Sequence, residues 1–206
     1  GSMSGVRAVS KGIADLAGTH IWSPEGYNVP FLEDYGISDV VLIRGYRRKQ
    51  GLIIGKNNPQ NIESLSDLLE KDLRMVNRNS GSGTRLLFDH LIDKTSKKLS
   101  REVNKTKENI KGYQYEVKSH NAVALAVKSG KADLGLGIET VARFNDLDFL
   151  PLRQENYDIL ARKDFLQSKI GKEFIDILKS EKFRKFLSEK PGLEQDPETG
   201  NVILEL

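Results

Sequence analysis

Strand-like and helix-like segments alternate between Arg74 and Leu152, and this alternation constrains the fold more than any other feature of the chain. The strand-like segments are short apolar runs, such as LGLGI at Leu134–Ile138, and the segments between them carry apolar residues at helical spacing. Strands that alternate with helices are typical of βαβ units, in which the strands run parallel. The sequence therefore predicts an α/β protein with a parallel sheet.

A sequence repeat indicates how this architecture is organised. VSKGIADLAGTH at Val9–His20 and VKSGKADLGLGI at Val127–Ile138 match in register at an offset of 118 residues (127 − 9). Each copy reads as a helix end, a glycine stop, Ala-Asp-Leu and an apolar strand. Two copies are too few for a solenoid and favour two similar α/β lobes with a cleft between them. Coincidence is the alternative, because Gly-x-Ala-Asp-Leu is a common way to leave a helix and enter a strand.

The glycine-rich turn NRNSGSGTR, Asn77–Arg85, is the stretch with the most chemical character. It follows a predicted strand and leads into a predicted helix, whose first N–H groups have no internal acceptor and carry a partial positive charge. Glycines let a ligand approach the backbone, hydroxyls add donors and an arginine adds a charged fork, so the turn suits a phosphate, a carboxylate or another oxyanion. The candidate ligand-binding residues of the turn are Ser80, Gly81, Ser82, Gly83, Thr84 and Arg85.

The turn has a second, purely structural interpretation. It lacks the Gly-Lys-Ser/Thr of a P-loop and the third glycine of the dinucleotide fingerprint. Its serines and threonine can simply cap the helix, while its glycines relax a tight turn. Arg85 and the open α/β context favour an anion site at the carboxyl edge of the sheet.

Further candidates lie where other predicted helices begin. His120 and Asn121 open one helix, and Glu139 and Thr140 open another. Because the carboxyl ends of parallel strands meet at one edge of a sheet, these residues and the glycine-rich turn are expected to line one cleft. Helix capping is the alternative for His120. Arg47 belongs to a basic trio between two predicted strands, which either faces an anion or lies on the solvated surface.

No constellation of residues indicates catalysis or metal binding, so we expect a binding protein and not an enzyme. The three histidines are far apart in sequence, no His-x-x-x-His or Glu-x-x-His pair occurs, and the chain has no cysteine. A net charge of +3 does not indicate nucleic-acid binding, and no apolar run approaches the length of a membrane span. No signal peptide is visible, so we expect a cytoplasmic location, or an extracytoplasmic one if a signal peptide before Gly1 has been removed.

Segments outside the central run have weaker patterns. Two strands are predicted at Asp39–Arg44 and Gln50–Gly55, with a connection between them, and two more at Phe149–Leu152 and Tyr157–Ala161. The lysine-rich segment 94–111 predicts a mobile connection or a solvated helix. The remaining expectations are a helix that ends at Gly12 and a helical stretch over Leu166–Leu187 that Gly171 interrupts.

Five longer stretches carry a family resemblance, and they are YNVPFLEDYG, YRRKQGLIIGKNNPQNIESLSDLL, RMVNRNSGSGTRLLFDHLI, HNAVALAVKSGKADLGLGIE and LDFLPLRQENYDILARKDFL. Together they resemble the periplasmic-binding-protein-like (type 2) domain. That domain occurs alone, fused to molybdopterin biosynthesis proteins, or in LysR-type substrate-binding regulators attached to a DNA-binding part. The resemblance covers nearly the whole chain from about Val9, and NRNSGSGTR with GKADLGLGI is its most specific pair.

The resemblance implies two α/β lobes, two crossovers and a ligand in a central cleft. We expect lobe 1 at residues 4–55 and 158–206 and lobe 2 at residues 56–157. The family begins with a strand and a helix before the segment matching Val9–Leu16, so lobe 1 is expected to be N-terminally truncated. The implied function is non-enzymatic binding of a small oxyanion, molybdate or tungstate, without a cofactor. The second-lobe ligands that the resemblance implies are Ser80, Ser82, Thr84, His120 and Asn121.

Other functions remain open at this stage. The domain can be a regulatory or accessory module of a molybdenum-cofactor biosynthesis protein or transcription regulator, with a catalytic or DNA-binding domain upstream. It can also have lost ligand binding and serve as a protein–protein platform. An organic acid or a pterin is an alternative ligand. A homodimer, in which a neighbour lends the missing strand, is a further expectation.

Overall fold

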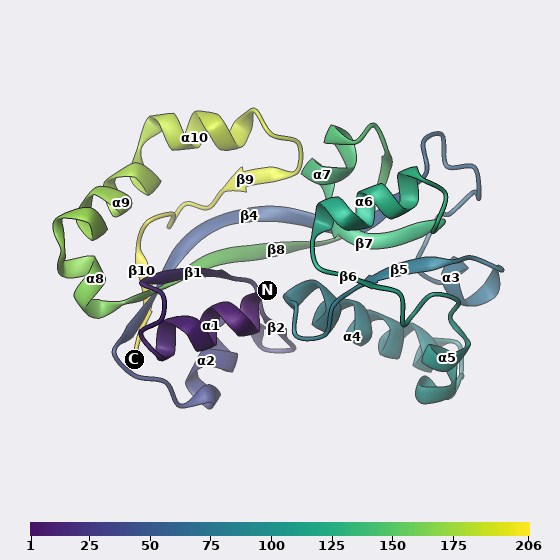
Figure 1. The fold of residues 1–206 in the computed structure, drawn as a ribbon, viewed down its shortest axis with the longest axis horizontal. Coiled ribbons are helices and arrows are strands. Elements are labelled where there is room, and N and C mark those ends of the chain that lie inside the picture. Colours follow the sequence, from purple (N-terminus) through teal and green to yellow (C-terminus); the bar gives the residue numbers. More distant parts are fainter. The chain divides into compact units, whose positions relative to one another are not determined.

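The computed structural model describes residues 1–206 and divides them into two compact units. Unit 1 comprises Gly1–Arg48 and Gln154–Leu206, and unit 2 comprises Lys49–Arg153. The predicted boundaries, at 55/56 and 157/158, lie seven and four residues further along the chain than the boundaries of these units. Two long strands, β4 (Val40–Ile54) and β8 (Asp148–Arg162), run from one unit into the other (Figure 1).

These long strands correct the prediction of two pairs of short strands. Each of them is a single strand of 15 residues. Gly45, at the start of the predicted connection, and Gly51 lie inside β4 where β8 approaches closely. An added Cβ would lie 2.0 Å from the carbonyl oxygen of Tyr157 at Gly45, and 2.1 Å from that of Leu150 at Gly51. The glycines therefore permit close backbone approach, which is a known use of glycine within a strand.

Unit 1 is a small antiparallel sheet flanked by helices. Its elements besides parts of β4 and β8 are α1 (Ser2–Ser10), β1 (Leu16–Thr19), β2 (Trp22–Ser23), β3 (Gly26–Tyr27), α2 (Val29–Tyr35), α8 (Lys163–Gln167), α9 (Lys169–Lys179), α10 (Glu181–Ser188), β9 (Leu193–Gln195) and β10 (Val202–Glu205). β1 pairs with the end of β8, with Leu16 opposite Ala161, and β10 and β9 pair with the first part of β4. β2 and β3 form a separate hairpin.

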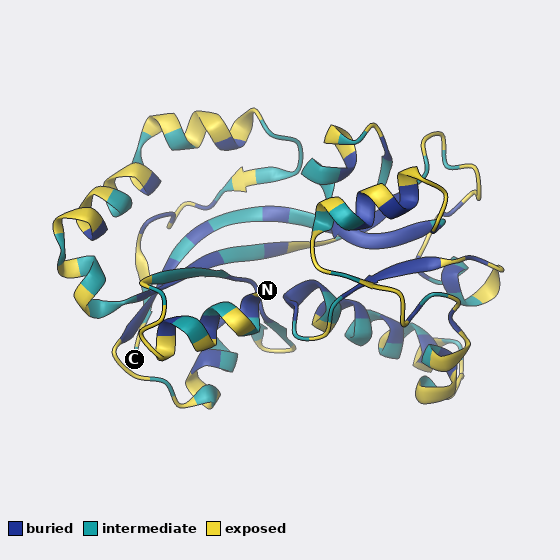
Figure 2. Ribbon diagram, in the orientation of Figure 1, coloured by how far each residue is buried: buried dark blue, intermediate teal, exposed yellow.

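The helices of unit 1 present one apolar face to the sheet. Val6 and Val9 of α1 are buried against Leu160 of β8, and Leu178 of α9 is buried in a second cluster with Ile43 of β4. The opposite faces of α9 and α10 are exposed (Figure 2). This one-sided burial is what amphipathic helices on a sheet provide.

The predicted break of the C-terminal helical stretch falls at serines and not at Gly171. Ser168 and Ser180 end one helix and cap the next, and their Oγ atoms accept hydrogen bonds from the N–H groups of Gly171 and Phe183 at 3.1 and 3.2 Å. Serine is a favoured N-cap because its hydroxyl satisfies an N–H group that lacks a helical partner. The break therefore follows capping chemistry, and Gly171 lies in the first turn of α9.

Unit 2 is a layered α/β unit. Its elements besides parts of β4 and β8 are α3 (Asp67–Glu70), β5 (Met75–Arg78), α4 (Gly83–Lys98), α5 (Val103–Asn109), β6 (Glu116–Val117), α6 (His120–Lys128), β7 (Leu134–Ile138) and α7 (Glu139–Phe144). β5 pairs parallel with β6 and β7, as predicted, and β7 pairs antiparallel with β4. One apolar cluster gathers around Phe88 and Ile92 of α4, and another around Val123 and Val127 of α6.

The lysine-rich segment 94–111 contributes to this unit more than its composition predicts. α4 continues to Lys98 and α5 follows it. Ser96, Thr106 and Ile110 are buried, and Ile110 belongs to the cluster around Phe88. The many lysines make the composition of the segment polar, and this composition does not reveal the few residues that pack inward.

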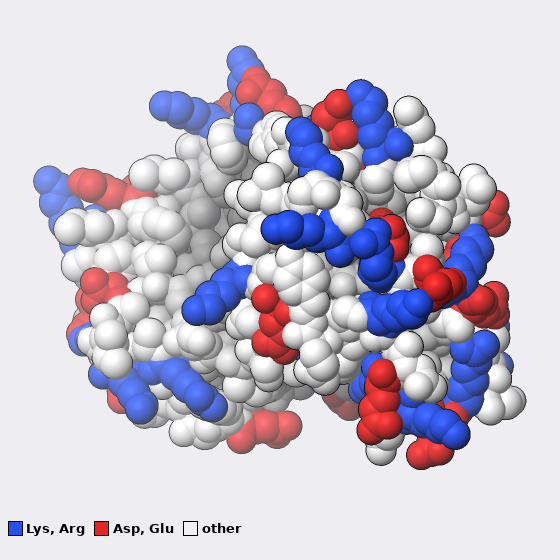
Figure 3. Space-filling model, turned by 45° about the vertical axis from the view of Figure 1, so that its right-hand side comes forward, with Lys and Arg blue, Asp and Glu red and all other residues white.

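The surface carries both signs of charge. Lys and Arg are interspersed with Asp and Glu on the face shown in Figure 3. No helix of the structure is both long enough and apolar enough to cross a membrane.

The sequence repeat has the same backbone geometry in both units, which confirms that each copy is a helix–glycine–strand unit. α1 leads into β1 in unit 1, and α6 leads into β7 in unit 2. The linking residues Gly12 and Gly130 have φ angles of +66° and +71°. The N–H groups of Ala14 and Ala132 donate to the carbonyl groups two residues before the helix end, at 3.1 and 3.2 Å, with the same offset in both copies.

Replacing Gly130 with alanine is expected to lower the free energy of unfolding by about 1–2 kcal/mol, because a left-handed backbone is strained for any residue with a Cβ. Nothing lies within 4 Å of the added Cβ, so packing contributes no further effect. Urea unfolding followed by circular dichroism measures the change. Ser129→Ala, at a negative φ of −85°, is the matched control and should change the free energy of unfolding by less than about 0.5 kcal/mol. Equal stability of the two variants would contradict the expectation.

Candidate functional site

The Ser80–Arg85 turn begins α4 with the geometry of a capped helix. Ser82 is the N-cap, and its Oγ accepts a hydrogen bond from the N–H of Arg85 at 3.1 Å. Gly81 has a φ of +76°, a conformation that favours glycine. The N–H groups of Gly83 and Thr84, at the first two helical positions, have no acceptor in the protein. The cap therefore leaves two amides without a partner, and both belong to buried residues.

The turn residues differ in exposure. Ser80 is exposed, whereas Ser82 and Thr84 are buried. Thr84 Oγ1 lies 3.5 Å from Nε2 of the fully buried Gln50, a β4 residue that the sequence analysis did not single out. None of the four cavities described in the structure is lined by residues 80–85. Of the three hydroxyls of the turn, that of Ser80 therefore belongs to the most exposed residue.

Arg85 has partners of its own within unit 2. Its Nε donates to both carboxylate oxygens of Asp89 at 3.0 Å, and its Nη1 donates to Glu116 at 2.8 Å. The guanidinium also lies over the ring of Tyr113, 4.5 Å from the centroid. The sequence predicts that the Arg85 guanidinium binds a negatively charged ligand. In the structure two carboxylates already compensate that charge, so Arg85 clamps α4 to the segment that precedes α6.

The other predicted residues of unit 2 lie at two further helix starts. His120 is the first residue of α6, where the Oγ of Ser119 caps the helix and accepts from the N–H of Ala122 at 3.1 Å. Asn121 is exposed. Glu139 opens the short helix α7, is mostly buried, and lies 3.8 Å from Nζ of Lys49. Thr140, the next residue of α7, is half-buried.

Strand direction brings these three helix starts to one edge of unit 2. β5, β6 and β7 are parallel, so the helix starts that follow them lie beyond the same ends of the strands. The structure thus groups the glycine-rich turn, His120 with Asn121, and Glu139 with Thr140. Arg47 is not among them, because it belongs to unit 1.

The basic trio that includes Arg47 lies within β4, and each of its members faces an acid. Arg47 Nε donates to Asp196 at 2.7 Å, and Lys49 pairs with Glu139. The middle residue, Arg48, is buried and donates to Glu155. The expectation of a connection between strands was wrong. Arg47 and Lys49 are partly solvated, with side chains 39% and 44% exposed, whereas Arg48 is buried.

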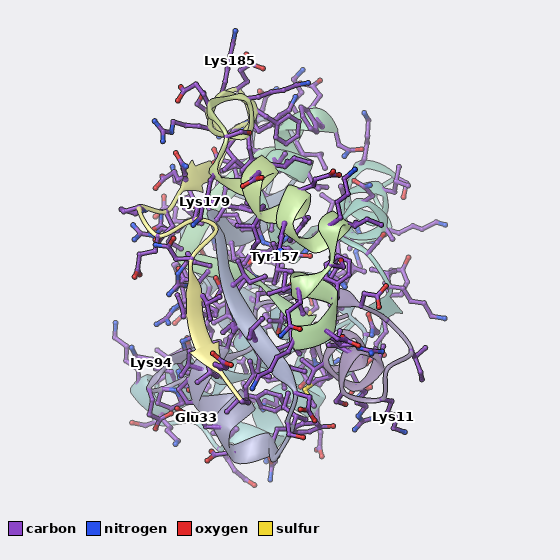
Figure 4. The ribbon with its side chains drawn as sticks, turned by 90° about the vertical axis from the view of Figure 1, so that its left-hand side faces the viewer. Lys11, Glu33, Lys94, Tyr157, Lys179 and Lys185 are labelled. Carbon is purple, nitrogen blue, oxygen red and sulfur yellow. The ribbon has the colours of Figure 1, made fainter.

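Unit 1 has a cavity that sequence reasoning missed. It has a volume of about 390 Å³ and lies at the start of α1. Its lining consists of Gly1, Ser2, Ser4, Gly5, Ala17, Gly18, His20 and Tyr157. No carboxylate or lysine lines it, and its polar groups are hydroxyls, an imidazole, backbone amides at the helix start and the α-amino group of Gly1. Tyr157 is labelled near the middle of Figure 4.

A buried charged cluster supports one wall of this cavity. His20 Nδ1 lies 2.9 Å from Glu155 Oε2, and Glu155 also accepts from Nε of Arg48. The Arg48 guanidinium lies over the Tyr157 ring, 4.2 Å from the centroid. Burial alone would raise the pKa of Glu155, but the charges of Arg48 and His20 and their hydrogen bonds outweigh it and hold that pKa below its usual range. The carboxylate is therefore ionised at neutral pH and fixes the His20 ring.

The repeat is the signal that could have found this cavity. Subtracting the offset of 118 from His120 gives Ser2, so the two helix starts occupy equivalent positions in the two copies. The match between the two copies is visible in the sequence only from Val9 onward, because Ser2–Ala8 and His120–Ala126 share few residues.

Comparison with known proteins shows the family. The chain belongs to the PBP superfamily, since the PBP superfamily domain matches residues 1–179. It is 35% identical over 213 residues to the protein YvgK of Bacillus subtilis (strain 168), in an alignment that covers 100% of this chain and 64% of YvgK. The chain thus spans less than two thirds of that relative's length.

Solved structures share the fold at low sequence identity. A putative phosphate ABC transporter substrate-binding protein with bound phosphate from Clostridium perfringens has a TM-score of 0.65 at 14% identity, over 95% of this chain and 85% of its own. PEB3 with bound L-phospholactate has a TM-score of 0.60 at 19% identity, over 80% of this chain and 73% of its own. These similarities confirm the expected periplasmic-binding-protein type of fold.

Proposed function

We propose that this domain binds a small anion without chemically changing it. The observation that carries the proposal is the unit 1 cavity at the start of α1, where Ser2, Ser4 and His20 line a space of about 390 Å³ without any carboxylate. A helix start offers N–H groups and the positive end of the helix dipole, which together favour a negative ligand. Hydroxyls and an imidazole add directional donors.

The same chemistry recurs in unit 2 at the Ser80–Thr84 turn. There the amides of Gly83 and Thr84 have no acceptor, and the exposed Ser80 adds a hydroxyl. We propose Ser80–Thr84, His120 and Asn121 as a candidate anion site of unit 2 by itself, and we assign Arg85 a positioning role because Asp89 and Glu116 hold it.

The ligand class that fits these donors is a compact oxyanion. Amides and hydroxyls bind a tetrahedral anion through its several oxygens. Phosphate is bound by the C. perfringens structural neighbour, and molybdate or tungstate follows from the family resemblance. The four ligands to test are phosphate, sulfate, molybdate and tungstate.

Replacing Ser4 with glutamate is expected to weaken anion binding by about 10- to 100-fold, because a carboxylate would then line the unit 1 cavity and repel the ligand. The side chain is exposed and lies in the first turn of α1, where an acidic residue stabilises a helix. The fold should therefore be retained. Isothermal titration calorimetry with each of the four oxyanions measures the effect.

Ser10→Glu is the matched control, because it makes the same change at the exposed far end of the same helix. It should leave anion binding within about twofold of the parent. Ser80→Glu is the unit 2 arm, and it tests whether the glycine-rich turn contributes. Binding that survives Ser4→Glu would overturn the unit 1 site, and binding that survives both Ser4→Glu and Ser80→Glu would overturn both candidate sites. An unmodified protein that binds none of the four oxyanions would favour the protein–protein platform.

We propose as a second possibility that this chain is one domain of a longer protein. The observation that favours it is the 64% of YvgK that this chain spans. In that setting the domain is a ligand-responsive module. The mass of the natural protein, measured on cell extract and compared with 23.1 kDa, tests this.

A further inference from the structure

Unit 1 contains a second small cavity with a different character, formed between the β2–β3 hairpin and α2. Its volume is about 250 Å³. Its lining consists of Trp22, Ser23, Glu25, Pro30, Phe31, Asp34 and Tyr35. Three aromatic rings and two carboxylates thus surround one space, whereas the anion cavity at α1 has no acidic lining.

Local structure holds the rings in place. The Phe31 and Tyr35 side chains, four residues apart on α2, have ring centroids 5.1 Å apart. Trp22 is paired with Tyr27 in the hairpin. The fully buried Asn28 joins hairpin to helix, because its Oδ1 accepts from the N–H of Ile21 at 2.8 Å while the residue caps α2. The aromatic wall is therefore built on a fixed backbone.

The charges at this cavity are unbalanced. The carboxylates of Glu25 and Asp34 are exposed and make no ion pair or hydrogen bond in the structure. One cation touches the lining, since Nε of Arg7 donates to the hydroxyl of Tyr35 at 3.2 Å, but Arg7 does not itself line the cavity. Negative charge and aromatic faces both attract a positive group.

We infer that this cavity binds a compact organic cation of the quaternary or methylated ammonium class. The faces of aromatic rings attract cations through their quadrupole, and such cages are a known way to bind quaternary ammonium groups. The volume lies below the range of about 300–1,000 Å³ that is usual for drug-sized ligands, so it suits one cationic head group. A metal ion fits less well, because only two carboxylates are present and most of the remaining lining is aromatic.

This inference does not depend on the proposed anion site. The two cavities share no lining residue, and they select ligands of opposite charge. Failure of one proposal therefore leaves the other unaffected.

Tryptophan fluorescence gives a direct measurement, because Trp22 is the sole tryptophan of the chain and lines the cavity. The probes are choline and its uncharged carbon isostere dimethylbutanol, at constant ionic strength. Choline should change the emission of Trp22 in a saturable way, and the neutral isostere should bind about tenfold more weakly because it lacks the cation–π and charge attraction.

One double variant, in which both carboxylates become neutral amides, tests the role of the carboxylates. Glu25→Gln with Asp34→Asn should weaken choline binding by about tenfold, since two negative charges that attract the choline cation are removed without loss of side-chain volume. Glu33→Gln is the matched control: Glu33 is exposed on the same helix but outside the lining, and is labelled in Figure 4. The inference is overturned if choline gives no saturable response, if the isostere binds equally well, or if Glu33→Gln weakens binding as much as the double variant.

Discussion

Glu155→Ala is expected to destabilise the protein by about 3–5 kcal/mol, because it leaves a buried charge without its partner. Glu155 is 1% exposed and accepts hydrogen bonds from Arg48 and His20, and Arg48 is itself 6% exposed. Removal of the carboxylate leaves the Arg48 guanidinium in the interior of unit 1 with no counter-charge. Urea unfolding followed by Trp22 fluorescence measures the loss, since the sole tryptophan lies in this unit.

The pH dependence of stability gives this prediction a second readout. The pKa of Glu155 is lowered in the folded protein, so its contribution is present above the pKa that glutamate has in the unfolded chain. That contribution is lost as the pH falls through the folded-state pKa. Glu155→Gln cannot titrate and should lose less stability on acidification than the parent. Glu33→Ala, at an exposed position of the same unit, should change stability by less than about 0.5 kcal/mol. A Glu155→Ala loss of that small size would show that the cluster is not a stabilising ion pair.

Phe88→Ala is expected to destabilise the protein by about 3–5 kcal/mol, because it opens a cavity in the core of unit 2. Phe88 is fully buried on α4 with Met75 and Leu134 in one cluster, and its ring centroid lies 6.3 Å from that of Tyr113. Circular dichroism during urea unfolding measures the change.

Leu86→Ala is the matched control for that loss. Leu86 lies two residues before Phe88 on the same helix and is 37% exposed. Its truncation removes little buried surface, so the free energy of unfolding should fall by about 1 kcal/mol at most. Equal effects at the two positions would mean that this cluster is not the core of unit 2.

The regular parts of the fold were predictable from local patterns. The run from Arg74 to Leu152 alternates cleanly, and the parallel pairing of β5 with β6 and β7 follows it. The family resemblance and the type of fold were also right. The continuous strand β4 was harder to predict, because Gly45 locally suggests a turn. In the structure Gly45 is required because the backbone of β8, more than 100 residues further along the chain, approaches it closely.

The site was predictable only in part, for a similar physical reason. Sequence spacing places Ser80–Thr84 at a helix start, and the structure shows that helix start. Sequence spacing cannot show that Arg85 meets Glu116, because that pairing depends on the path of the chain between them. The Arg48–Glu155 pair likewise joins residues that are 107 positions apart in the chain. Long-range ion pairs decide which charges remain available to a ligand, and local patterns do not contain them.

The nested order of the two units has a consequence for how the nascent chain matures. Unit 2 is translated entirely before residue 154, so it can fold while unit 1 still waits for its second half. Until then Val40–Ile43 lacks β10 and the end of β8, and an apolar strand without neighbours invites aggregation. Translation that stops early would release such an unpaired strand. Synthesis of Gln154–Leu206 therefore protects Gly1–Arg48 from aggregation.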